Sequence, residues 1–327
     1  MSENLKQAIQ TAVARDLADI EQALTENLTP YLDRVREIAG HILFGGGKRI
    51  RPLLMILSAR ICGYEKDDAA DFAILFEYLH TATLLHDDLV DYASVRRGKP
   101  VANVIWGNAS AVLTGDFLLA RASSLAVRTR KMEILEILAR ITEDMSQGEL
   151  HQLVRKGDPA LSEEEYLQII RNKTAVLMQG ACLSGAILAD ATPERKQALS
   201  DYGLNLGMAF QMADDLLDYI SDSEQLGKAV GADLREGKFT LPLIASLARA
   251  GHDDAKKIKE MMNNREFSVD AFQALNRLLD QYGGIAYTRS CAAAYVDKAK
   301  AALSVFAPST TGNVLAMLAD YTLMRNN

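Results

Sequence analysis

Helical periodicity runs along almost the whole chain and limits the possible folds more than any other feature of the sequence. Apolar residues recur three or four positions apart, the spacing that places them on one face of an α-helix. The sequence shows no long alternation of apolar and polar residues, so it predicts no extended sheet. We expect helices at residues 3–28, 31–44, 52–62, 67–91, 101–127, 131–150, 163–190, 194–220, 240–250, 254–263, 269–281, 283–304 and 312–325.

Prolines and loop lengths indicate how these helices are arranged. Five of the seven prolines stand where a helical pattern starts, the place where a helix tolerates proline: Pro30, Pro52, Pro159, Pro193 and Pro242. Short loops between long helices join antiparallel neighbours, and no linker or shift in composition divides the 327 residues. We therefore predict an all-α fold with a single domain, residues 1–327, built as a large antiparallel helical bundle around a central cavity.

Charge and composition exclude several classes of function. A net charge of −7 leaves no basic surplus to neutralise phosphates, so nucleic acid is not an expected partner. The three cysteines, Cys62, Cys182 and Cys291, match no zinc or redox spacing and are expected to be buried thiols. The first residues lack the basic-then-apolar order of a signal peptide, and the apolar stretches are too short for a membrane span. These features predict a cytoplasmic protein without a transmembrane segment.

An acidic cluster that occurs twice is the strongest chemical signal. Asp-Asp-Leu-Val-Asp at 87–91 and Asp-Asp-Leu-Leu-Asp at 214–218 each place two carboxylates one helical turn apart on one face. Like charges at that spacing destabilise a helix by roughly 0.2–0.5 kcal/mol per pair. Mg²⁺ would neutralise them, since it binds one or two carboxylates together with waters and substrate phosphates. Two facing clusters therefore predict a metal-bridged diphosphate site formed by Asp87, Asp88, Asp91, Asp214, Asp215 and Asp218.

Two basic segments complement these carboxylates. Residues 45–52 read Gly-Gly-Gly-Lys-Arg-Ile-Arg-Pro, which puts Lys48 and Arg51 beside the N-terminus of a helix, where an anion is favoured. Arg96 and Arg97 follow the first acidic cluster, and arginine binds phosphate in a bidentate manner. Each segment alone would also fit a solvated surface loop. Together with the carboxylates, they indicate a second diphosphate.

Other polar residues carry weaker signals. Lys173 and Thr174 lie in an apolar helical stretch, where a lysine either reaches the surface or contacts a phosphate. A glycine-rich segment behind the second acidic cluster carries Lys228 and Lys238 and is a candidate lid.

Histidines give one candidate ligand and one rival interpretation. His80 is a candidate donor to a phosphate, although an isolated histidine on such a helix is more often a core residue. The pair His86–Asp87 is compatible with a metal-dependent phosphohydrolase. That class needs further histidine ligands, and the remaining histidines show no such pattern.

Taken in order, these motifs resemble those of the trans-polyprenyl diphosphate synthases. The resemblance extends from about residue 30 to the C-terminus. Within the family, the chain looks most like the bacterial members that make an octaprenyl chain. The motifs that carry it are Gly-Gly-Gly-Lys-Arg-Ile-Arg-Pro (45–52), His80, Leu-Leu-His-Asp-Asp-Leu-Val-Asp (84–91), Arg96-Arg97-Gly98, Gly115-Asp116-Phe117, Lys173-Thr174, Phe-Gln-Met-Ala-Asp-Asp-Leu-Leu-Asp (210–218) and Gly227-Lys228.

The resemblance implies a homodimeric trans-prenyltransferase of the isoprenoid synthase fold. Such an enzyme condenses isopentenyl diphosphate repeatedly onto an allylic diphosphate such as farnesyl diphosphate and supplies the side chain of an isoprenoid quinone. It implies two or three Mg²⁺ ions held by Asp87, Asp91 and Asp214, with support from Asp88, Asp215 and Asp218. Isopentenyl diphosphate would bind Lys48, Arg51, His80 and Arg97, and the allylic substrate Arg96, Lys173, Thr174, Gln211, Lys228 and Lys238.

Side chains upstream of the first acidic cluster govern product length in this family. Ala82 and Thr83, five and four residues before Asp87, are small, so the tunnel is expected to be open on that side, with Leu79 further down. This predicts a long product. A terpene cyclase shares the aspartates but would not explain the basic segments, and a regulatory subunit of a heteromeric synthase should have degraded acidic clusters.

Overall fold

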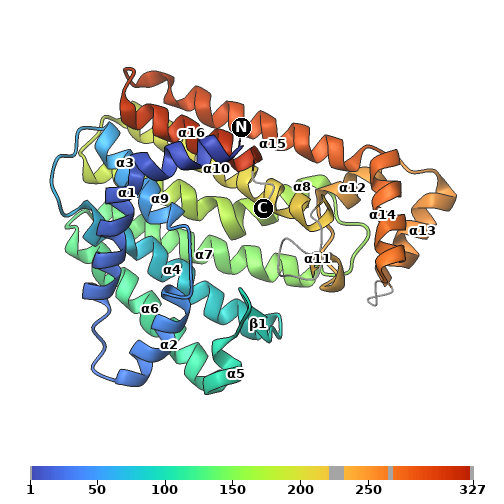
Figure 1. Cartoon of the computed structure of the whole chain (residues 1–327), viewed down its shortest axis with the longest axis horizontal. Coiled ribbons are helices and arrows are strands. Elements are labelled where there is room, and N and C mark those ends of the chain that lie inside the picture. The colour runs from blue at the N-terminus through green and yellow to red at the C-terminus, as the bar shows by residue number, and fades with distance from the viewer. Residues whose placement is uncertain (1, 221–231, 264–267, 325–327) are drawn as a thin grey trace.

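The computed structural model describes residues 2–220, 232–263 and 268–324, and these residues are almost entirely helical (Figure 1). A short antiparallel hairpin of β1 (Val95–Arg96) and β2 (Lys99–Pro100) is the one pair of strands in the described part of the chain. The helices are α1 (Ser2–Asn27), α2 (Asp33–Leu43), α3 (Ile50–Ile61), α4 (Ala69–Val90), α5 (Ala102–Trp106), α6 (Asn108–Arg128), α7 (Met132–Val154), α8 (Glu163–Ile170), η1 (Arg171–Ala175), α9 (Val176–Leu188), α10 (Pro193–Ile220), α11 (Ala232–Arg235), α12 (Leu241–Leu247), α13 (His252–Asn263), α14 (Val269–Gln281), α15 (Gly284–Ala302), η2 (Leu303–Val305) and α16 (Thr310–Met324).

The predicted all-α fold is confirmed, and two predicted helices are interrupted. Gly107 splits the segment expected at 101–127 into α5 and α6, since its φ of 83° is a conformation that glycine adopts readily. The segment expected at 163–190 contains the π-helical turn η1 between α8 and α9. A π turn inserts one residue into a helix, which apolar periodicity over so short a stretch does not reveal.

Two apolar clusters form the core, and α10 contributes to both. The larger cluster is built chiefly on α3, α4, α6, α9 and α10, and Tyr78 and Tyr202 are among its fully buried side chains. The smaller one gathers residues of α8, α10, α12 and α14. Since one long helix spans both clusters, we retain the single-domain organisation as a proposal.

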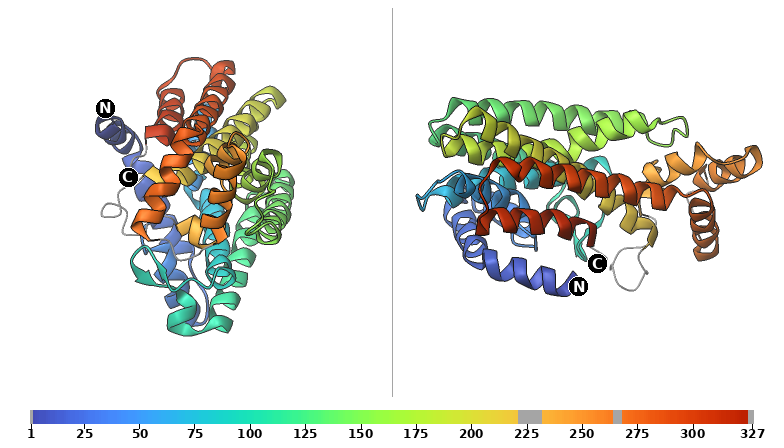
Figure 2. Two further views of the ribbon diagram at one scale, coloured as in Figure 1. Left: turned by 90° about the vertical axis from the view of Figure 1, so that its right-hand side faces the viewer. Right: turned by 90° about the horizontal axis from the view of Figure 1, so that it is seen from above.

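The long helices run roughly along the length of the molecule. α7, α9, α10 and α15 follow this direction in Figure 1, and Figure 2 shows α15 and α16 side by side. α9 packs between α3 and α10, and α4 packs on α6. The two helices that carry the acidic clusters, α4 and α10, both contribute residues to the wall of one cavity.

Candidate active site

One cavity of about 960 Å³ collects most of the predicted site residues. Its walls come from the start of α3, the faces of α4, α6 and α7, the η1 turn, and α10. Asp87 and Asp214, the first residues of the two acidic clusters, both line it. The other predicted residues on its wall are Lys48, Arg51, Leu79, His80, Thr83, Arg96, Arg97, Lys173, Thr174 and Gln211.

The three aspartates of the first cluster have different surroundings. Asp88 is 2% exposed and accepts two hydrogen bonds from Arg96 Nε, at 2.9 Å and 3.2 Å. Asp91 lies 3.9 Å from Lys156 Nζ. Asp87 alone lines the cavity, and burial raises its pKa to about 6, an effect that Glu149 and Asp91 reinforce and Lys173 opposes. A cation bound nearby would stabilise the ionised form of this carboxylate.

The second cluster repeats this division of surroundings. Asp214 is exposed to the cavity, whereas Asp215 is 5% exposed. Asp215 accepts hydrogen bonds from Gln211 Nε2 at 2.8 Å and from Tyr166 Oη at 2.6 Å. Asp218 is half-buried and is not among the cavity-lining residues.

The carboxylates do not form a closed metal cage. Within the described residues, no three His, Cys, Asp or Glu side chains converge on one metal position. Asp87 and Asp214 instead face a common space from two helices. This donor set fits Mg²⁺, which commonly takes one or two carboxylates and completes its octahedron with waters and substrate phosphates.

The basic loop before α3 is held in place by a buried arginine. Arg49 is 5% exposed, adopts a left-handed conformation (φ 50°), and donates to Glu21 Oε1 at 2.6 Å and Glu77 Oε1 at 2.7 Å. Lys48 and Arg51 line the cavity on either side of this anchored residue, which also contributes to the wall. Buried Arg51 Nε has no hydrogen-bond partner in the described part of the chain. An unsatisfied guanidinium donor at a cavity wall suits an anionic ligand.

Positive charge is concentrated around His80. Burial and the nearby guanidinium groups of Arg51, Arg96 and Arg97 hold the pKa of His80 well below its usual value. The imidazole is therefore neutral at pH 7, while the arginines stay protonated. Burial also lowers the pKa of Arg51, against the opposing charge of Glu77. A diphosphate would offset this crowding of cations.

The η1 turn presents Lys173 and Thr174 to the cavity. Lys173 Nζ lies 2.5 Å from Glu149 Oε2 on α7, and Thr174 Oγ1 donates to Gln211 Oε1 at 2.8 Å. α7 approaches this turn closely because residue 148 is glycine: a Cβ there would lie 2.8 Å from the backbone nitrogen of Lys173.

Besides the later aspartates of the two clusters, two predicted residues within the described part of the chain do not line the large cavity. Ala82 was expected on the tunnel wall, but it is fully buried in the larger apolar cluster and does not line the cavity. Lys238 lines a smaller adjoining cavity of about 90 Å³, and its Nζ is 2.6 Å from Glu236 Oε2. Lys228 falls outside the described residues.

The sequence analysis did not identify three polar residues around the site: Glu149, Lys156 and Tyr166. Each contacts a predicted residue, respectively Lys173, Asp91 and Asp215. None of them stands in a motif that we took to mark a site. Gly148 next to Glu149 was the single sequence signal, because a glycine in mid-helix often permits a close approach.

Comparison with known proteins identifies the family. The polyprenyl synthetase family matches residues 33–279, and the chain belongs to this family. This defines its class as that of the all-α polyprenyl synthases.

Individual relatives match over nearly the full chain. The octaprenyl diphosphate synthase of Escherichia coli is 40% identical over 97% of this chain and 98% of its own length. The geranyl-diphosphate-specific all-trans-nonaprenyl-diphosphate synthase of Rhodobacter capsulatus is 37% identical over 99% of both chains. A polyprenyl synthase from Caulobacter crescentus, solved with calcium and isoprenyl diphosphate, superposes with a TM-score of 0.91 and 42% identity over 98% of this chain and 97% of its own.

Proposed function

We propose that the protein is a long-chain trans-polyprenyl diphosphate synthase that adds isopentenyl diphosphate repeatedly to an allylic diphosphate such as farnesyl diphosphate. One observation supports the proposal: a single cavity is lined both by two carboxylates, which we assign to metal-bound diphosphate, and by a group of cationic side chains, which we assign to a second diphosphate. The first is formed around Asp87 and Asp214, the second around Lys48, Arg51 and Arg97. An octaprenyl product that supplies a quinone side chain is the form we favour, in keeping with the names of the E. coli and other relatives.

The cavity residues fit the steps of such a condensation. When the allylic C–O bond breaks, negative charge develops on the departing diphosphate, and Lys173 and Arg96 are placed to stabilise it. The allylic carbocation then alkylates the double bond of isopentenyl diphosphate, a C–C bond forms, and a proton is lost. Lys48, Arg51 and the neutral His80 would hold the diphosphate that stays on the product. These steps require no protein nucleophile.

We propose Mg²⁺ as the metal, with two or three ions shared between Asp87, Asp91, Asp214 and the substrate phosphates. Bound there, Mg²⁺ would act as a Lewis acid on the leaving diphosphate. The raised pKa of Asp87 supports this assignment, because it comes mainly from burial of the carboxylate, whose ionised form a bound cation would stabilise.

A homodimer would cover an exposed apolar face. α6 is the one described helix that is long and apolar enough to cross a bilayer, and 39% of its apolar window is buried. Val112, Leu113 and Val127 of α6 are exposed, as are Val104 and Ile105 of the neighbouring α5. We assign this face to a second copy of the chain and not to lipid, because α6 also packs on α4 and α7 in the helical core. A cytoplasmic location, where its diphosphate substrates are soluble, is part of the same proposal.

The direct test is to size the products of the purified protein incubated with Mg²⁺, farnesyl diphosphate and labelled isopentenyl diphosphate. We expect products near 40 carbons and no incorporation in the presence of EDTA. Absence of labelled prenyl product would refute the proposed reaction. Products no longer than 20 carbons would refute its long-chain part.

A second test separates the two diphosphate pockets. Lys48→Ala and Arg51→Ala should raise the KM for isopentenyl diphosphate by roughly 10- to 100-fold, because each removes a charged contact to it. Arg96→Ala should act mainly on the KM for the allylic substrate. If all three substitutions altered only the allylic KM, the assignment of the pockets would be wrong.

A further inference from the structure

Tyr166 on α8 has no part in the reaction outlined above, yet it is tied to the site. Its side chain is 3% exposed, and its hydroxyl donates to Asp215 Oδ2 at 2.6 Å. It lines the small cavity that adjoins the large one and shares Lys173, Thr174 and Gln211 with it. A buried phenol that bonds to an aspartate of the second acidic cluster therefore stands one layer behind the substrate cavity.

Three hydrogen bonds connect Tyr166 to the cavity wall. Asp215 Oδ1 accepts from Gln211 Nε2 at 2.8 Å, and Gln211 Oε1 accepts from Thr174 Oγ1 at 2.8 Å. An ionised carboxylate only accepts, so Gln211 must turn its amide NH₂ toward Asp215 and its carbonyl toward Thr174. The Thr174 hydroxyl consequently donates to Gln211 and presents its lone pairs elsewhere. The state of Asp215 thus fixes the orientation of two side chains on the cavity wall.

The π-helical turn aligns the two ends of this chain. Tyr166 and Thr174 are eight residues apart, which in a regular α-helix would leave them about 80° apart around the axis. The η1 turn at 171–175 winds less per residue and brings both toward α10. Their partners Asp215 and Gln211 are one turn apart on a single face of α10.

Close packing holds the π turn against α10. A Cβ on Gly207 would lie 2.5 Å from Ala175 Cα, so glycine at this position permits the approach. Gly203, one turn earlier on α10, makes an equally close approach to the regular helix α9, where a Cβ would lie 2.6 Å from the carbonyl oxygen of Met178.

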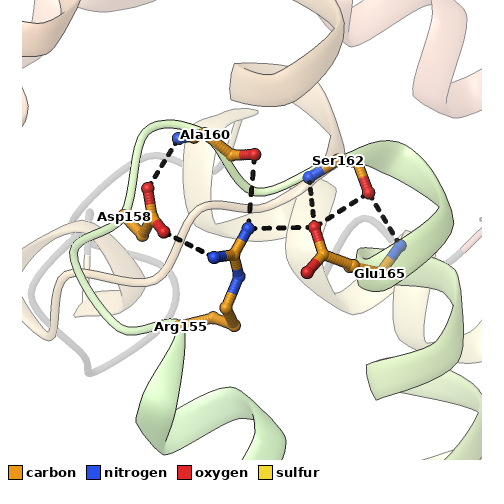
Figure 3. Close-up of polar contacts among 5 residues, drawn as sticks. All are labelled: Arg155, Asp158, Ala160, Ser162 and Glu165. Carbon is orange, nitrogen blue, oxygen red and sulfur yellow. Dashed lines mark hydrogen bonds and ion pairs between the residues drawn. The ribbon is translucent and has the colours of Figure 1, made fainter.

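The start of α8 is anchored beside Tyr166. Ser162 caps the helix and exchanges hydrogen bonds with Glu165 in a capping box. Arg155, from the end of α7, donates to Glu165 Oε2 at 2.9 Å and to Asp158 Oδ2 at 2.6 Å (Figure 3). Tyr166, the next residue along the chain, is thereby held at a fixed place relative to α7 and α10.

We propose that Tyr166 is a positioning residue for the allylic half of the site, acting through Asp215 and Gln211 on Thr174. The inference deepens the proposed function and rests on it for the identity of the ligand. Tyr166 fixes the carboxylate of Asp215, and the Asp215 carboxylate determines which groups of Gln211 and Thr174 face the allylic diphosphate. Isopentenyl diphosphate, bound by the arginine pocket, is not affected.

The substitution Tyr166→Phe removes the hydroxyl and keeps the ring. We expect the KM for farnesyl diphosphate to rise roughly 10-fold, as for loss of a buried hydrogen bond to a charged group, with the KM for isopentenyl diphosphate within about twofold of wild type. Tyr287→Phe is the matched control, because Tyr287 Oη donates to Glu163 Oε1 of the same helix at 2.8 Å and lines neither cavity. Equal effects of the two substitutions, or equal changes in both KM values, would overturn the proposal.

A double-mutant cycle with Thr174→Val tests the connection itself. Calorimetric titration with inorganic diphosphate and Mg²⁺ measures binding without turnover, so it stays informative even if wild-type protein makes no prenyl product and the proposed function fails. We expect the two substitutions to be non-additive, with the double variant binding about as weakly as the weaker single variant. Additive effects on the Kd would show that Tyr166 does not act through this chain.

Discussion

The two acidic clusters have nearly the same sequence, and the structure gives them the same plan with different partners. In each, the first aspartate, Asp87 or Asp214, lines the cavity. In each, the second is buried and accepts hydrogen bonds. Asp88 is held by a cation, Arg96, whereas Asp215 is held by the neutral donors Gln211 and Tyr166.

This difference indicates how each side of the site is stabilised. On α4 the buried charge is neutralised within the protein, so that part of the cluster is balanced before any ligand binds. On α10 two neutral donors, Gln211 and Tyr166, orient the carboxylate of Asp215 through hydrogen bonds. Hydrogen bonds from neutral side chains therefore help to hold the buried aspartate of α10, and an ion pair with Arg96 helps to hold that of α4.

The largest effect on turnover is expected from substituting the first aspartate of either cluster, the position at which the two clusters are alike. Asp87→Ala and Asp214→Ala should each lower turnover by about 10³-fold or more, because each removes a carboxylate placed to hold metal-bound diphosphate. Initial rates with farnesyl and isopentenyl diphosphate measure this. Asp190→Ala, which removes a surface partner of Lys131, is the control and should retain activity. A similar loss of folding stability and activity in the site variants would make these aspartates structural.

The helical fold and the positions of the two acidic clusters were predicted from local sequence patterns. Helix period, prolines and the repeated aspartates are all properties of neighbouring residues. The spacing of the aspartates alone does not separate Asp87 from Asp88, because the burial of Asp88 depends on where Arg96 returns after the turn; only the resemblance to the family gave the two residues different roles. Tyr166 and Glu149 were missed for a related reason: their partners come from other helices, and no spacing within one helix encodes such contacts.

The π turn likewise could not be predicted from the spacing of residues within one helix. Its position at 171–175 follows from the packing of Gly148 and Gly207 against it, from α7 and α10. Ala82 does not line the cavity, because a position five residues before Asp87 lies on a different side of α4 from one four residues before it. The sequence predicted helix α4 correctly but did not show that Ala82 faces the core and Thr83 faces the cavity.

Breaking the ion pair on α4 should cost more stability than breaking the neutral contact on α10. Arg96→Ala leaves Asp88 buried without its cation, and we expect a loss of about 2–3 kcal/mol, below the 3–5 kcal/mol of fully buried pairs because Arg96 is 33% exposed. Tyr166→Phe should lose about 1–2 kcal/mol. Urea unfolding at pH 7.5 without metal measures both. The reverse order would contradict the comparison of the two clusters.

The raised pKa of Asp87 predicts a pH-dependent effect of a neutral substitution. Its pKa is about 6 in the folded protein and 3.8 as an ordinary aspartate, so the folded state binds more protons between those values. The metal-free protein therefore loses stability as the pH rises from 3.8 to about 6, and the cost of ionised Asp87 disappears only below pH 3.8. Asp87→Asn should raise the free energy of unfolding by about 1–2 kcal/mol at pH 7.5 in EDTA and by only about a third as much at pH 4.5. A stability gain that is the same at both pH values would show that ionisation is not its cause.

A substitution four residues before an acidic cluster is expected to have the smallest effect on the reaction rate and the largest effect on the length of the product. Thr83 and Phe210 occupy this position on α4 and α10, and both line the cavity. An aromatic ring already stands on the α10 side, so the small Thr83 keeps the α4 side open. Thr83→Phe places a ring about one turn, or 5.4 Å, below Asp87, where a packed apolar tunnel has no room to move aside. We expect the first condensation to proceed within about threefold of the wild-type rate and the products to stop near 20 carbons.

Ala82→Phe provides the comparison, because Ala82 is buried outside the cavity. Its ring must displace α4 before it reaches the tunnel, so we expect shortened products together with a stability loss of about 1–3 kcal/mol from overpacking. Chromatographic sizing of products with farnesyl diphosphate as primer, alongside thermal unfolding, distinguishes the two variants. A folded, active Thr83→Phe enzyme that still makes the full-length chain would mean that the growing chain does not pass along this face of α4. The product would then have to extend along α10, past Phe210, and the contrast between an open and a closed side would be reversed.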